Sequence, residues 1–500
     1  MGNCTMDEYS MHIGGEFTDS TGDDRIPVRN PYNGEEWASV PSGTEEDIDR
    51  AVRAANAAFE SDAWAEFTQS RRRELLYDIA DVVEANLEEL ARLETKQNGR
   101  LFTETQGQMG HVAEYFRYFG RLCEAVGSGR TNPVDGTKAD LFNFTKKEPY
   151  GVVGAITPWN VPILLSAWKL APALAAGNAF VHKPSEQTPV SALRLAELIY
   201  EETEMPDGIY NVVPGDGEVA GATLTSHSGV DKVAFTGSTA VGREVAASAG
   251  RNLSAVSVEL GGKNPNVIFP SANIENAING VMRGIFASTG QVCMAGSRVL
   301  VHEAIHDEFL DRLLDNVSAI EVGDPMDPET DIGPMAFRDQ CETVKEYIGL
   351  GEEEGATIAY GGDSPEGAPS ECFIEPTVLT NVDNDMQVAQ EEIFGPVASV
   401  IPFEDEAEAV ALANDIDYGL AAGVWTEDMR QAHRLADDIR AGTVWINQYR
   451  IIAPNVPFGG FKDSGIGRES GLEGLKEYYQ TKSVYMDLSG EVTDPFAGEY

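Results

Sequence analysis

The chain has 500 residues, of which 42% are hydrophobic and 24% are charged, a composition typical of folded proteins and not of disordered ones. This length predicts two or three domains. No run approaches the roughly 20 apolar residues of a membrane span, and the first ten residues lack a signal-peptide pattern. We therefore expect a cytoplasmic protein.

The charge balance is strongly acidic, with 82 Asp and Glu residues against 36 Lys and Arg and a net charge of −46. Nucleic acids and anionic membranes bind positive surfaces, so neither is an expected partner. Self-repulsion of this size favours a halophilic host, because a Debye length near ~3 Å at 1 M salt would screen it. The alternative is an acidic protein without that adaptation.

The sequence predicts no metal site and no disulfide framework. Five scattered cysteines, at positions 4, 123, 293, 341 and 372, include no Cys-x-x-Cys pair. His302-Glu-Ala-Ile-His306 matches the H-E-x-x-H pattern of zinc proteases, which requires both histidines on one helix face. Here we expect His302 to end a strand and the next helix to begin only near Ala304.

Three helices are predicted in the first quarter of the chain. Residues 44–59 combine a Thr44-x-x-Asp47 capping box with helical spacing of apolar residues. Residues 70–93 continue in this style toward Asn98-Gly99, and a third helix covers 103–126. Their apolar stripes indicate core packing and no function.

From residue 141 onward, short apolar runs alternate with helical patterns, which predicts an α/β fold with parallel sheets and ligands at the carboxyl ends of strands. The strands expected first are 152–157, 179–182, 210–213, 233–235, 256–260 and 267–269, with helices near 166–176, 188–203, 217–226 and 239–249. A second α/β region has helices near 273–289, 304–317, 404–415 and 427–439 and strands near 298–302, 397–403, 421–425 and 443–447. Strands outside both cores are expected in 131–149 and after 482.

Cys293 is the candidate nucleophile. It lies in the centre of the segment 286–298, where glycines at 290 and 296 allow the backbone to approach a ligand closely. A cysteine thiolate is the strongest nucleophile among the common side chains, and it needs local help to form. The alternative is a small buried apolar residue.

Two further polar residues follow predicted strands. Asn160 carries an amide that can donate to a developing oxyanion, and the loss of one such donor typically costs ~10²–10³ in rate. Glu259 precedes two glycines at a strand end and can act as a base that activates water. The alternatives are a turn asparagine and a solvated glutamate.

Two motifs indicate a dinucleotide site. Lys183 and Glu186 follow a strand and offer a cation and an anion to ribose and phosphate groups. Phe235-Thr-Gly-Ser-Thr-Ala-Val-Gly242 places Gly237 and Ser238 at the start of a helix, a natural phosphate site. The G-x-G-x-x-G fingerprint of standard Rossmann domains is absent here.

Taken together, these segments resemble the aldehyde dehydrogenase superfamily over roughly residues 15–488. Seven motifs occur in the family's order, with no departure at a catalytic position. They are Thr157-Pro-Trp-Asn, Lys183-Pro-Ser-Glu, Phe235-Thr-Gly-Ser, Glu259-Leu-Gly-Gly-Lys, Gly290-Gln-Val-Cys, Glu392-Ile-Phe-Gly-Pro and Pro457-Phe-Gly-Gly-Phe-Lys-x-Ser-Gly-x-Gly-Arg-Glu469.

The resemblance implies the domains and their assembly. A Rossmann-like cofactor domain would comprise residues 1–130 and 150–261, and an α/β catalytic domain residues 262–465. A small β oligomerisation region would comprise 131–149 and 478–500, and homodimers or homotetramers are expected.

The resemblance also implies the catalytic roles. Cys293 would form a thiohemiacetal with the aldehyde, while Asn160 and the backbone N–H of Cys293 hold the oxyanion. After hydride transfer, Glu259 would activate the water that hydrolyses the thioester, and Lys169 would assist proton transfer. An aldehyde releases hydride only once it is tetrahedral and electron-rich, which a thiolate and an oxyanion donor provide.

NAD is the expected cofactor and NADP the alternative. The Glu186 carboxylate suits a free 2′-hydroxyl and would repel a 2′-phosphate, although Lys183 could soften that preference. Glu392 and Phe394 resemble residues that hold the nicotinamide ribose. The implied cofactor-binding residues are Ile156, Thr157, Pro158, Trp159, Lys183, Ser185, Glu186, Gly215, Phe235, Thr236, Gly237, Ser238, Leu260, Gly261, Glu392 and Phe394.

The substrate is expected to be a small uncharged aliphatic or aromatic aldehyde, because the residues near the motifs are mostly apolar. Arg450 leaves a carboxylated aldehyde open, and Trp445-Ile-Asn-Gln-Tyr-Arg450 resembles broad-specificity members. Core packing is the alternative role for the channel candidates. These candidates are Val161, Trp168, Phe286, Met294, Ile451 and Phe458.

Two rival functions remain open. The first is a CoA-acylating semialdehyde dehydrogenase, whose members generally lack the glutamate found here at position 259. The second is a non-catalytic binding or structural protein with the same fold, which the nucleophile, donor and base argue against.

Overall fold

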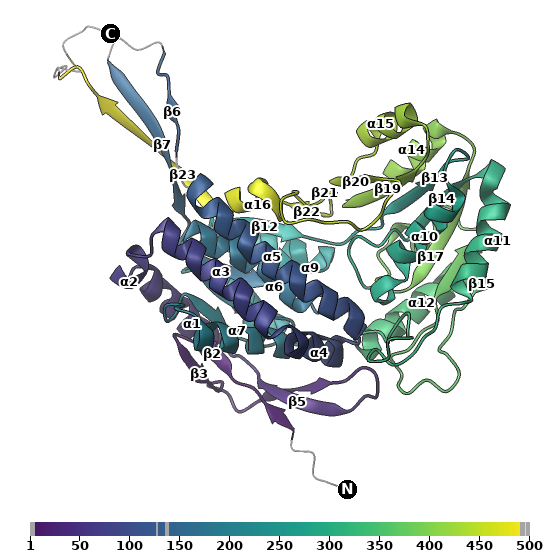
Figure 1. Cartoon of the computed structure of the whole chain (residues 1–500), viewed down its shortest axis with the longest axis horizontal. Helices are drawn as coiled ribbons and strands as arrows, with labels where there is room; N and C mark the ends of the chain where they lie inside the picture. Colours follow the sequence, from purple (N-terminus) through teal and green to yellow (C-terminus); the bar gives the residue numbers. More distant parts are fainter. Residues whose placement is uncertain (1–5, 127–128, 136–139, 491–495, 497–500) are drawn as a thin grey trace.

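The computed structural model describes residues 6–126, 129–135, 140–490 and 496. Figure 1 shows two α/β bodies side by side and an arm of strands that projects from the first body. Cys4 and parts of the expected segments 131–149 and 478–500 lie outside the described residues.

The first body contains an eight-stranded sheet in the order β22-β12-β11-β8-β9-β10-β2-β3. Its five central strands run parallel, and β22, β2 and β3 are antiparallel to their neighbours. After β8 the chain forms β9 on one side of it, and later forms β11 on the other side. The strand order therefore reverses at β8, and a ligand crevice is expected beyond this strand. The bounds are β2 (Met11–Ile13), β3 (Glu16–Thr18), β8 (Val152–Ile156), β9 (Ala179–Lys183), β10 (Tyr210–Val212), β11 (Lys232–Thr236), β12 (Ala255–Glu259) and β22 (Gly465–Ile466).

Helices pack around this sheet. The predicted capping box at the start of α1 is confirmed, because the Thr44 hydroxyl accepts from the Asp47 backbone N–H and the Asp47 carboxylate accepts from the Thr44 N–H. Every residue of α6 is buried, as its apolar sequence requires. The helices are α1 (Glu45–Phe59), α2 (Asp62–Ala65), α3 (Gln69–Ala85), α4 (Leu87–Asn98), α5 (Phe102–Val126), α6 (Pro162–Ala176), α7 (Val190–Glu202), η1 (Gly217–Gly221), α8 (Ala222–Ser226) and α9 (Thr239–Arg251).

The second body contains a seven-stranded sheet in the order β15-β16-β17-β14-β13-β19-β20, parallel except at β15. Its strands are β13 (Pro265–Ile268), β14 (Arg298–His302), β15 (Thr357–Tyr360), β16 (Thr377–Thr380), β17 (Val397–Phe403), β19 (Ala421–Trp425) and β20 (Thr443–Ile446). Its helices are α10 (Ile274–Ile285), η2 (Ala287–Gly290), η3 (Glu303–Ile305), α11 (His306–Val317), α12 (Arg338–Glu354), α13 (Gln387–Gln390), α14 (Glu406–Asn414) and α15 (Met429–Asp438).

Smaller strand groups complete the molecule. In the projecting arm, β23 pairs with β7 along nine residues, and β6 lies on the other side of β7. Near the N-terminus, β5 lies between β1 and β4. The remaining bounds are β1 (Asp7–Glu8), β4 (Arg25–Arg29), β5 (Glu36–Pro41), β6 (Thr131–Asn132), β7 (Leu141–Pro149), β18 (Tyr418–Gly419), β21 (Phe461–Lys462), α16 (Gly471–Lys476) and β23 (Tyr479–Asp487).

Several elements differ from the sequence prediction, and no element was predicted at α12, α13, β15, β16 or the N-terminal strands β1–β5. The helix expected over 70–93 is divided at Asn86, whose side chain donates to the Val82 carbonyl and interrupts the helical ladder. The strand expected at 267–269 was grouped with the first sheet, but β13 belongs to the second sheet. The chain crosses between the bodies directly after β12, through Gly261 and Gly262.

A segment near the C-terminus returns to the first body. In Figure 1 the yellow chain of β21, β22 and α16 lies between the two bodies. Strand β22 pairs antiparallel with β12, so Gly465 lies beside Glu259. The Ser464 hydroxyl donates to the Gly261 carbonyl over 2.7 Å, which fixes the turn that follows Glu259.

Candidate active site

A cavity of about 250 Å³ lies beyond the carboxyl ends of β8, β11 and β12. It brings together three of the four predicted catalytic residues, Asn160, Glu259 and Cys293, whereas Lys169 does not line it. Asn160 and Glu259 come from the first body, whereas Cys293 comes from the second. The other lining residues are Pro158, Trp159, Leu165, Thr236, Gly237, Ser238, Leu260, Gly261, Gln340, Thr343, Tyr347, Glu392, Ile393 and Phe394.

The amide of Asn160 is oriented by its neighbours. Asn160 follows β8 and directly precedes the segment that leads into α6, and its Nδ2 donates to the Gln291 carbonyl over 2.8 Å. Its own backbone carbonyl accepts from Asn98 Nδ2 over 3.2 Å. A terminal amide has two N–H groups, so one remains for a ligand in the cavity.

The carboxyl group of Glu259 is buried at the end of β12. Its Oε1 atom has no hydrogen-bond partner in the part of the chain that the structure describes. Burial raises the pKa of Glu259 well above its ordinary value, and the charge of Glu469 adds to this, while Lys169 acts in the opposite direction. Burial therefore favours the neutral form of this carboxyl group, which becomes a base only when it loses its proton.

The thiol of Cys293 is also held in its neutral form. Burial raises the pKa of Cys293 well above its ordinary value, and the charges of Glu259 and Glu392 raise it further. The Cys293 carbonyl accepts from Asn264 Nδ2 over 2.9 Å, so the backbone at the thiol is anchored to the start of the second body. The Glu259 carboxylate and the Cys293 thiolate are both negatively charged, so ionisation of one group disfavours ionisation of the other.

A buried ion pair lies behind Glu259. Lys169 on α6 and Glu469 near the C-terminus approach to 2.5 Å. The resemblance to the family implied a role for Lys169 only, and Glu469 was not assigned one. Its position as the last residue of the seventh motif was the signal that could have identified it.

The predicted cofactor residues fall mainly into two cavities. Nine of them line the cavity at Cys293. A second cavity, of about 270 Å³, is lined by Ile156, Lys183 and Phe235 together with residues of η1, α8 and α9. Glu186 lies beside Lys183, with 3.1 Å between Oε2 and Nζ. Thr157, Ser185 and Gly215 line neither cavity; the Thr157 hydroxyl instead bonds to His182 over 2.8 Å.

Glu392 and Phe394 form one wall of the first cavity. Glu392 accepts from the Gly262 backbone N–H over 3.1 Å, and burial raises its pKa to about 7. Phe394 has a positive φ of 58° and packs edge-on against Trp159 with 5.1 Å between ring centroids. A non-glycine residue in this conformation is strained, and such strain occurs most often at functional sites.

The backbone fits a dinucleotide. A Cβ at Gly261 would lie 2.1 Å from Glu392 Oε2, and one at Gly237 would lie 2.5 Å from the Phe235 ring. Ser238 caps the N-terminus of α9, whose first N–H groups are suited to a phosphate. The chain therefore has small residues, a helix N-terminus and carboxylates at the positions that were predicted for a dinucleotide.

Five lining residues were not assigned to the site from the sequence: Leu165, Ile393 and three residues of α12. The residues of α12 are Gln340, Thr343 and Tyr347. The sequence analysis assigned no helix between residues 335 and 397. Because α12 has only four buried residues, Cys341, Val344, Ile348 and Gly351, its apolar periodicity is a weak signal.

None of the predicted channel residues lines the cavity at Cys293. Trp168 packs against Phe458, with 5.6 Å between ring centroids, and both are nearly fully buried. Phe286 and Met294 are buried, Val161 is partly buried and Ile451 is exposed. Leu165, one turn before Trp168 on α6, is the aliphatic residue of that helix that reaches the cavity.

The zinc-protease pattern has the geometry that was expected. His302 ends β14, and α11 begins at His306, so the two histidines do not share a helix. Among the described residues, no three His, Cys, Asp or Glu side chains form a group suited to a metal ion. Over the same residues, no helix has both the length and the apolar character that a membrane crossing requires.

Comparisons with known proteins identify the family. The model of the aldehyde dehydrogenase family matches residues 17–484. A betaine aldehyde dehydrogenase of Mesorhizobium japonicum is 44% identical over 493 residues, covering 97% of this chain and 99% of the relative. An aldehyde dehydrogenase of Aspergillus niger is 44% identical over 481 residues, covering 96% and 95% of the two chains.

The NAD⁺ complex of an aldehyde dehydrogenase from Bacillus cereus superposes with a TM-score of 0.94 at 43% identity, covering 96% of this chain and 97% of that one. The chain therefore belongs to the aldehyde dehydrogenase family.

Proposed function

We propose that this protein oxidises an aldehyde to the carboxylic acid, with NAD as the hydride acceptor. The observation that carries this function is the convergence of Asn160, Glu259 and Cys293 on one cavity from two separate bodies. A thiol nucleophile, an oxyanion donor and a water-activating base are the groups that covalent oxidation of an aldehyde requires.

In the first step, the thiol of Cys293 gives its proton to water, and the thiolate sulfur then attacks the aldehyde carbon. The carbonyl oxygen becomes an oxyanion, which Asn160 Nδ2 and the backbone N–H of Cys293 stabilise. NAD, when bound, supplies the acceptor for the hydride that leaves this carbon. The product of that transfer is a thioester on Cys293.

In the second step, Glu259 takes a proton from a water molecule, whose oxygen attacks the thioester carbon. The carbon–sulfur bond breaks, the acid leaves and Cys293 is restored. Burial and the charge of Glu469 raise the pKa of Glu259. Its base form therefore becomes populated at a higher pH than that of an ordinary glutamate. Lys169 and Glu469 form an internal path by which the proton gained by Glu259 can be passed on.

The dinucleotide would lie across both cavities. Lys183 and Glu186 would contact the ribose of the adenosine half, Gly237 and Ser238 the phosphates, and Glu392 and Phe394 the nicotinamide ribose. Ile156, Thr157, Pro158, Trp159, Ser185, Gly215, Phe235, Thr236, Leu260 and Gly261 would complete the site. NAD is favoured over NADP because the Glu186 carboxylate would repel a 2′-phosphate.

The proposed substrate is uncharged. Arg450 was the one group near the site that left a carboxylated aldehyde open, but its guanidinium is engaged by the protein. It donates to the carbonyls of Arg283 and Ala287, each over 3.0 Å, and to the Ser288 hydroxyl over 3.3 Å. The names of the relatives include both aldehyde and betaine aldehyde dehydrogenases, so an aldehyde panel must include that cation.

The rival functions each have a distinguishing result. A CoA-acylating enzyme would form acyl-CoA when CoA is added, whereas Glu259 in the cavity supports release to water. A non-catalytic relative would bind the dinucleotide without forming NADH. Assays of an aldehyde panel with NAD and with NADP in high KCl, with and without CoA, test all three possibilities; the absence of NADH formation across the panel would contradict the proposal.

The roles of the larger units follow from the same proposal. The first body would bind the cofactor, the second would carry the nucleophile, and the arm of β6, β7 and β23 would join subunits in a homodimer or homotetramer. Several apolar side chains of this arm are exposed, among them Phe142, Tyr485 and Met486. A location in the cytoplasm agrees with the reducing conditions that a catalytic thiol requires.

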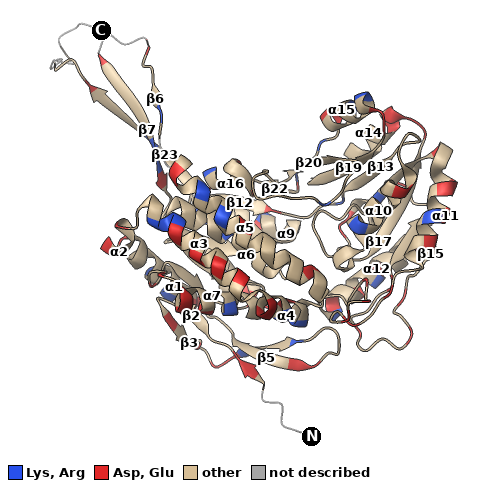
Figure 2. Ribbon diagram, in the orientation of Figure 1, with Lys and Arg blue, Asp and Glu red and all other residues tan. Residues whose placement is uncertain are grey.

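We also propose that the host is halophilic, and the net charge of the chain is the basis of this proposal. Figure 2 shows Asp and Glu residues on helices of both bodies, including α3 and α11. With a net charge of −46, the folded chain repels itself in dilute solution, and salt would screen this repulsion.

A further inference from the structure

The backbone just before Cys293 adopts a conformation that its residues disfavour. Ser288 and Thr289 have φ values of 56° and 53°, and Gly290 has a φ of 70°, so three successive residues are left-handed. Only glycine adopts this conformation without steric cost. We name Ser288–Gly290 the catalytic turn, because it sets the direction in which the chain enters Cys293.

Side chains from distant parts of the chain hold the catalytic turn. The Glu104 carboxylate accepts from the Ser288 backbone N–H and from the Ser288 hydroxyl, both over 3.0 Å. Arg450 donates to the same hydroxyl and to the Ala287 carbonyl. Thr289 donates to the Gly333 carbonyl over 3.1 Å. Hydrogen bonds that involve a charged group are among the stronger ones, so Glu104 and Arg450 are the main anchors of the turn.

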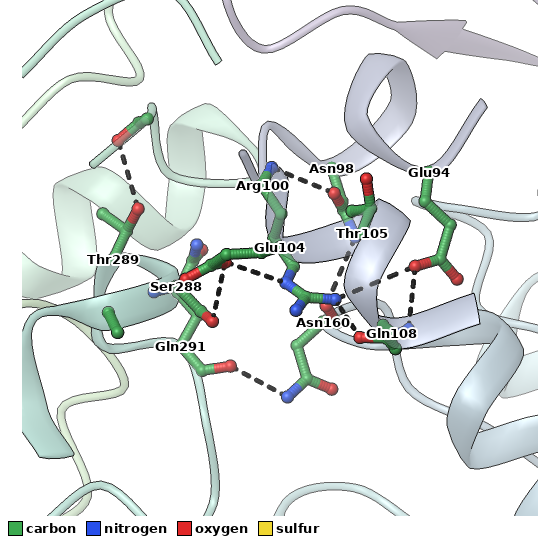
Figure 3. A network of polar contacts seen from close by, with 12 residues as sticks. Glu94, Asn98, Arg100, Glu104, Thr105, Gln108, Asn160, Ser288, Thr289 and Gln291 are labelled. Carbon is green, nitrogen blue, oxygen red and sulfur yellow. Dashed lines mark hydrogen bonds and ion pairs between the residues drawn. The ribbon is translucent and has the colours of Figure 1, made fainter. Parts of the chain in front are cut away.

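Glu104 belongs to a buried network that also holds the opposite side of the active site (Figure 3). Arg100 lies between two carboxylates, 3.6 Å from Glu104 and 3.8 Å from Glu94. Glu94 accepts from the backbone N–H of Ile163 over 2.7 Å, three residues after Asn160. Asn98, from the same segment, donates to the Asn160 carbonyl.

We propose that Glu104 is a positioning residue that fixes Cys293 relative to the amide of Asn160. The segment from Glu94 to Glu104 bonds to the Asn160 loop at one end and to the catalytic turn at the other, so it sets the separation of nucleophile and oxyanion donor. Glu104 lines neither cavity and acts only through the backbone that it holds. The inference rests on the proposed function, because the separation of Cys293 and Asn160 matters for the rate only if these residues act as nucleophile and oxyanion donor.

The test is Glu104→Gln, which keeps the shape of the side chain but turns one acceptor into a donor facing Ser288. Displacement of a reacting group by about 1 Å can reduce a rate about 10²-fold, so the rate of NADH formation in a single turnover should fall by at least about tenfold. The affinity for NAD, measured by calorimetry, should not change. A variant with the parent rate would overturn the proposal.

A matched control is Glu354→Gln. Glu354 also accepts from a backbone N–H, that of Gln387 at the start of α13, over 2.8 Å, and it lines neither cavity. This variant should retain the parent rate. If both variants lose activity and stability equally in thermal unfolding, Glu104 has only a structural role and the proposal is wrong.

Alkylation of Cys293 by iodoacetamide separates positioning from a direct charge effect and does not need dehydrogenase activity. The dependence of the alkylation rate on pH reports the fraction of Cys293 that is in the thiolate form. With Glu104→Gln the alkylation rate at high pH should change severalfold while the midpoint of the profile stays at the parent value, because Glu104 is not among the charges that act on Cys293. A shifted midpoint with an unchanged plateau would overturn the positioning role. If the parent forms no NADH but this result holds, the proposed function fails and the positioning role stands.

Discussion

Lys169 Nζ lies 2.5 Å from Glu469 Oε1, and the two side chains are 0% and 6% exposed. Burial of this pair behind Glu259 is costly unless each charge is matched, so the loss of one partner leaves a strongly unfavourable charge. Burial is the main cause of the raised pKa of Glu259, and the pair modulates it, since Glu469 raises the pKa further and Lys169 lowers it.

Glu469→Gln should therefore shift the pH profile of steady-state turnover. Without the negative charge of Glu469, the pKa of Glu259 falls, and its base form persists to lower pH. The acid limb of the profile should move to lower pH, while turnover at the optimum decreases because the proton path is interrupted. A profile that moves to higher pH would contradict this account.

Cys293→Ala should abolish NADH formation, because Cys293 is the only thiol among the described residues that line the cavity. NAD should still bind, since the cofactor contacts are separate from the thiol. Absorbance at the NADH band measures the first quantity and calorimetry the second. Dehydrogenase activity that survives the substitution would show that the nucleophile lies elsewhere.

Glu259→Gln should permit hydride transfer once and then stop at the thioester. A rapid burst of NADH with negligible further turnover is expected, and mass spectrometry should detect the acylated protein. The substitution should also lower the midpoint for alkylation of Cys293, because the charge of Glu259 raises the pKa of that thiol. Turnover at the parent rate would place the base at another residue.

Glu186→Gln should increase the use of NADP. The carboxylate lies 3.1 Å from Lys183, and its removal frees that ammonium group for a 2′-phosphate. The ratio of kcat/KM for NADP to that for NAD should rise about tenfold or more, since like charges in contact cost several kcal/mol. The control is Glu197→Gln on α7, whose carboxylate pairs with Arg194 and lines neither cavity. An unchanged ratio would remove Glu186 from cofactor selection.

Salt should stabilise the protein. The net charge of −46 predicts that the midpoint of thermal unfolding rises from dilute buffer to molar KCl, because screening reduces self-repulsion. Sucrose at matched osmolality provides the control for effects that do not depend on charge. Equal or higher stability in dilute buffer would contradict the halophilic interpretation.

The sequence predicted those parts of the fold for which local and global signals agree. The apolar run of α6 and the capping box of α1 each have a strong local pattern, and both elements form where expected. Motifs that follow strands brought nine of the sixteen residues predicted to bind the cofactor to one cavity. The assignment of β13 to a sheet depended on contacts with β14 and β19, which lie far away in the sequence, so periodicity alone could not provide it.

The unpredicted part of the site depends on long-range polar contacts. Glu104 lies on α5, 184 residues before Ser288, and nothing in its local sequence distinguishes it from a surface glutamate. Thr343 reaches the cavity from a helix whose exposed faces obscure its pattern. Left-handed Ser288 and Thr289 could not be predicted, because side chains elsewhere in the chain impose that conformation.

The pairing of β22 with β12 has a consequence for biosynthesis. Gly465 and Glu469 belong to the last tenth of the chain, yet one lies beside Glu259 and the other influences its protonation. A nascent polypeptide on the ribosome therefore has the thiol and the oxyanion donor long before it has a complete base. Reactive aldehydes in the cell meet a competent catalyst only after translation has ended and this last segment has docked.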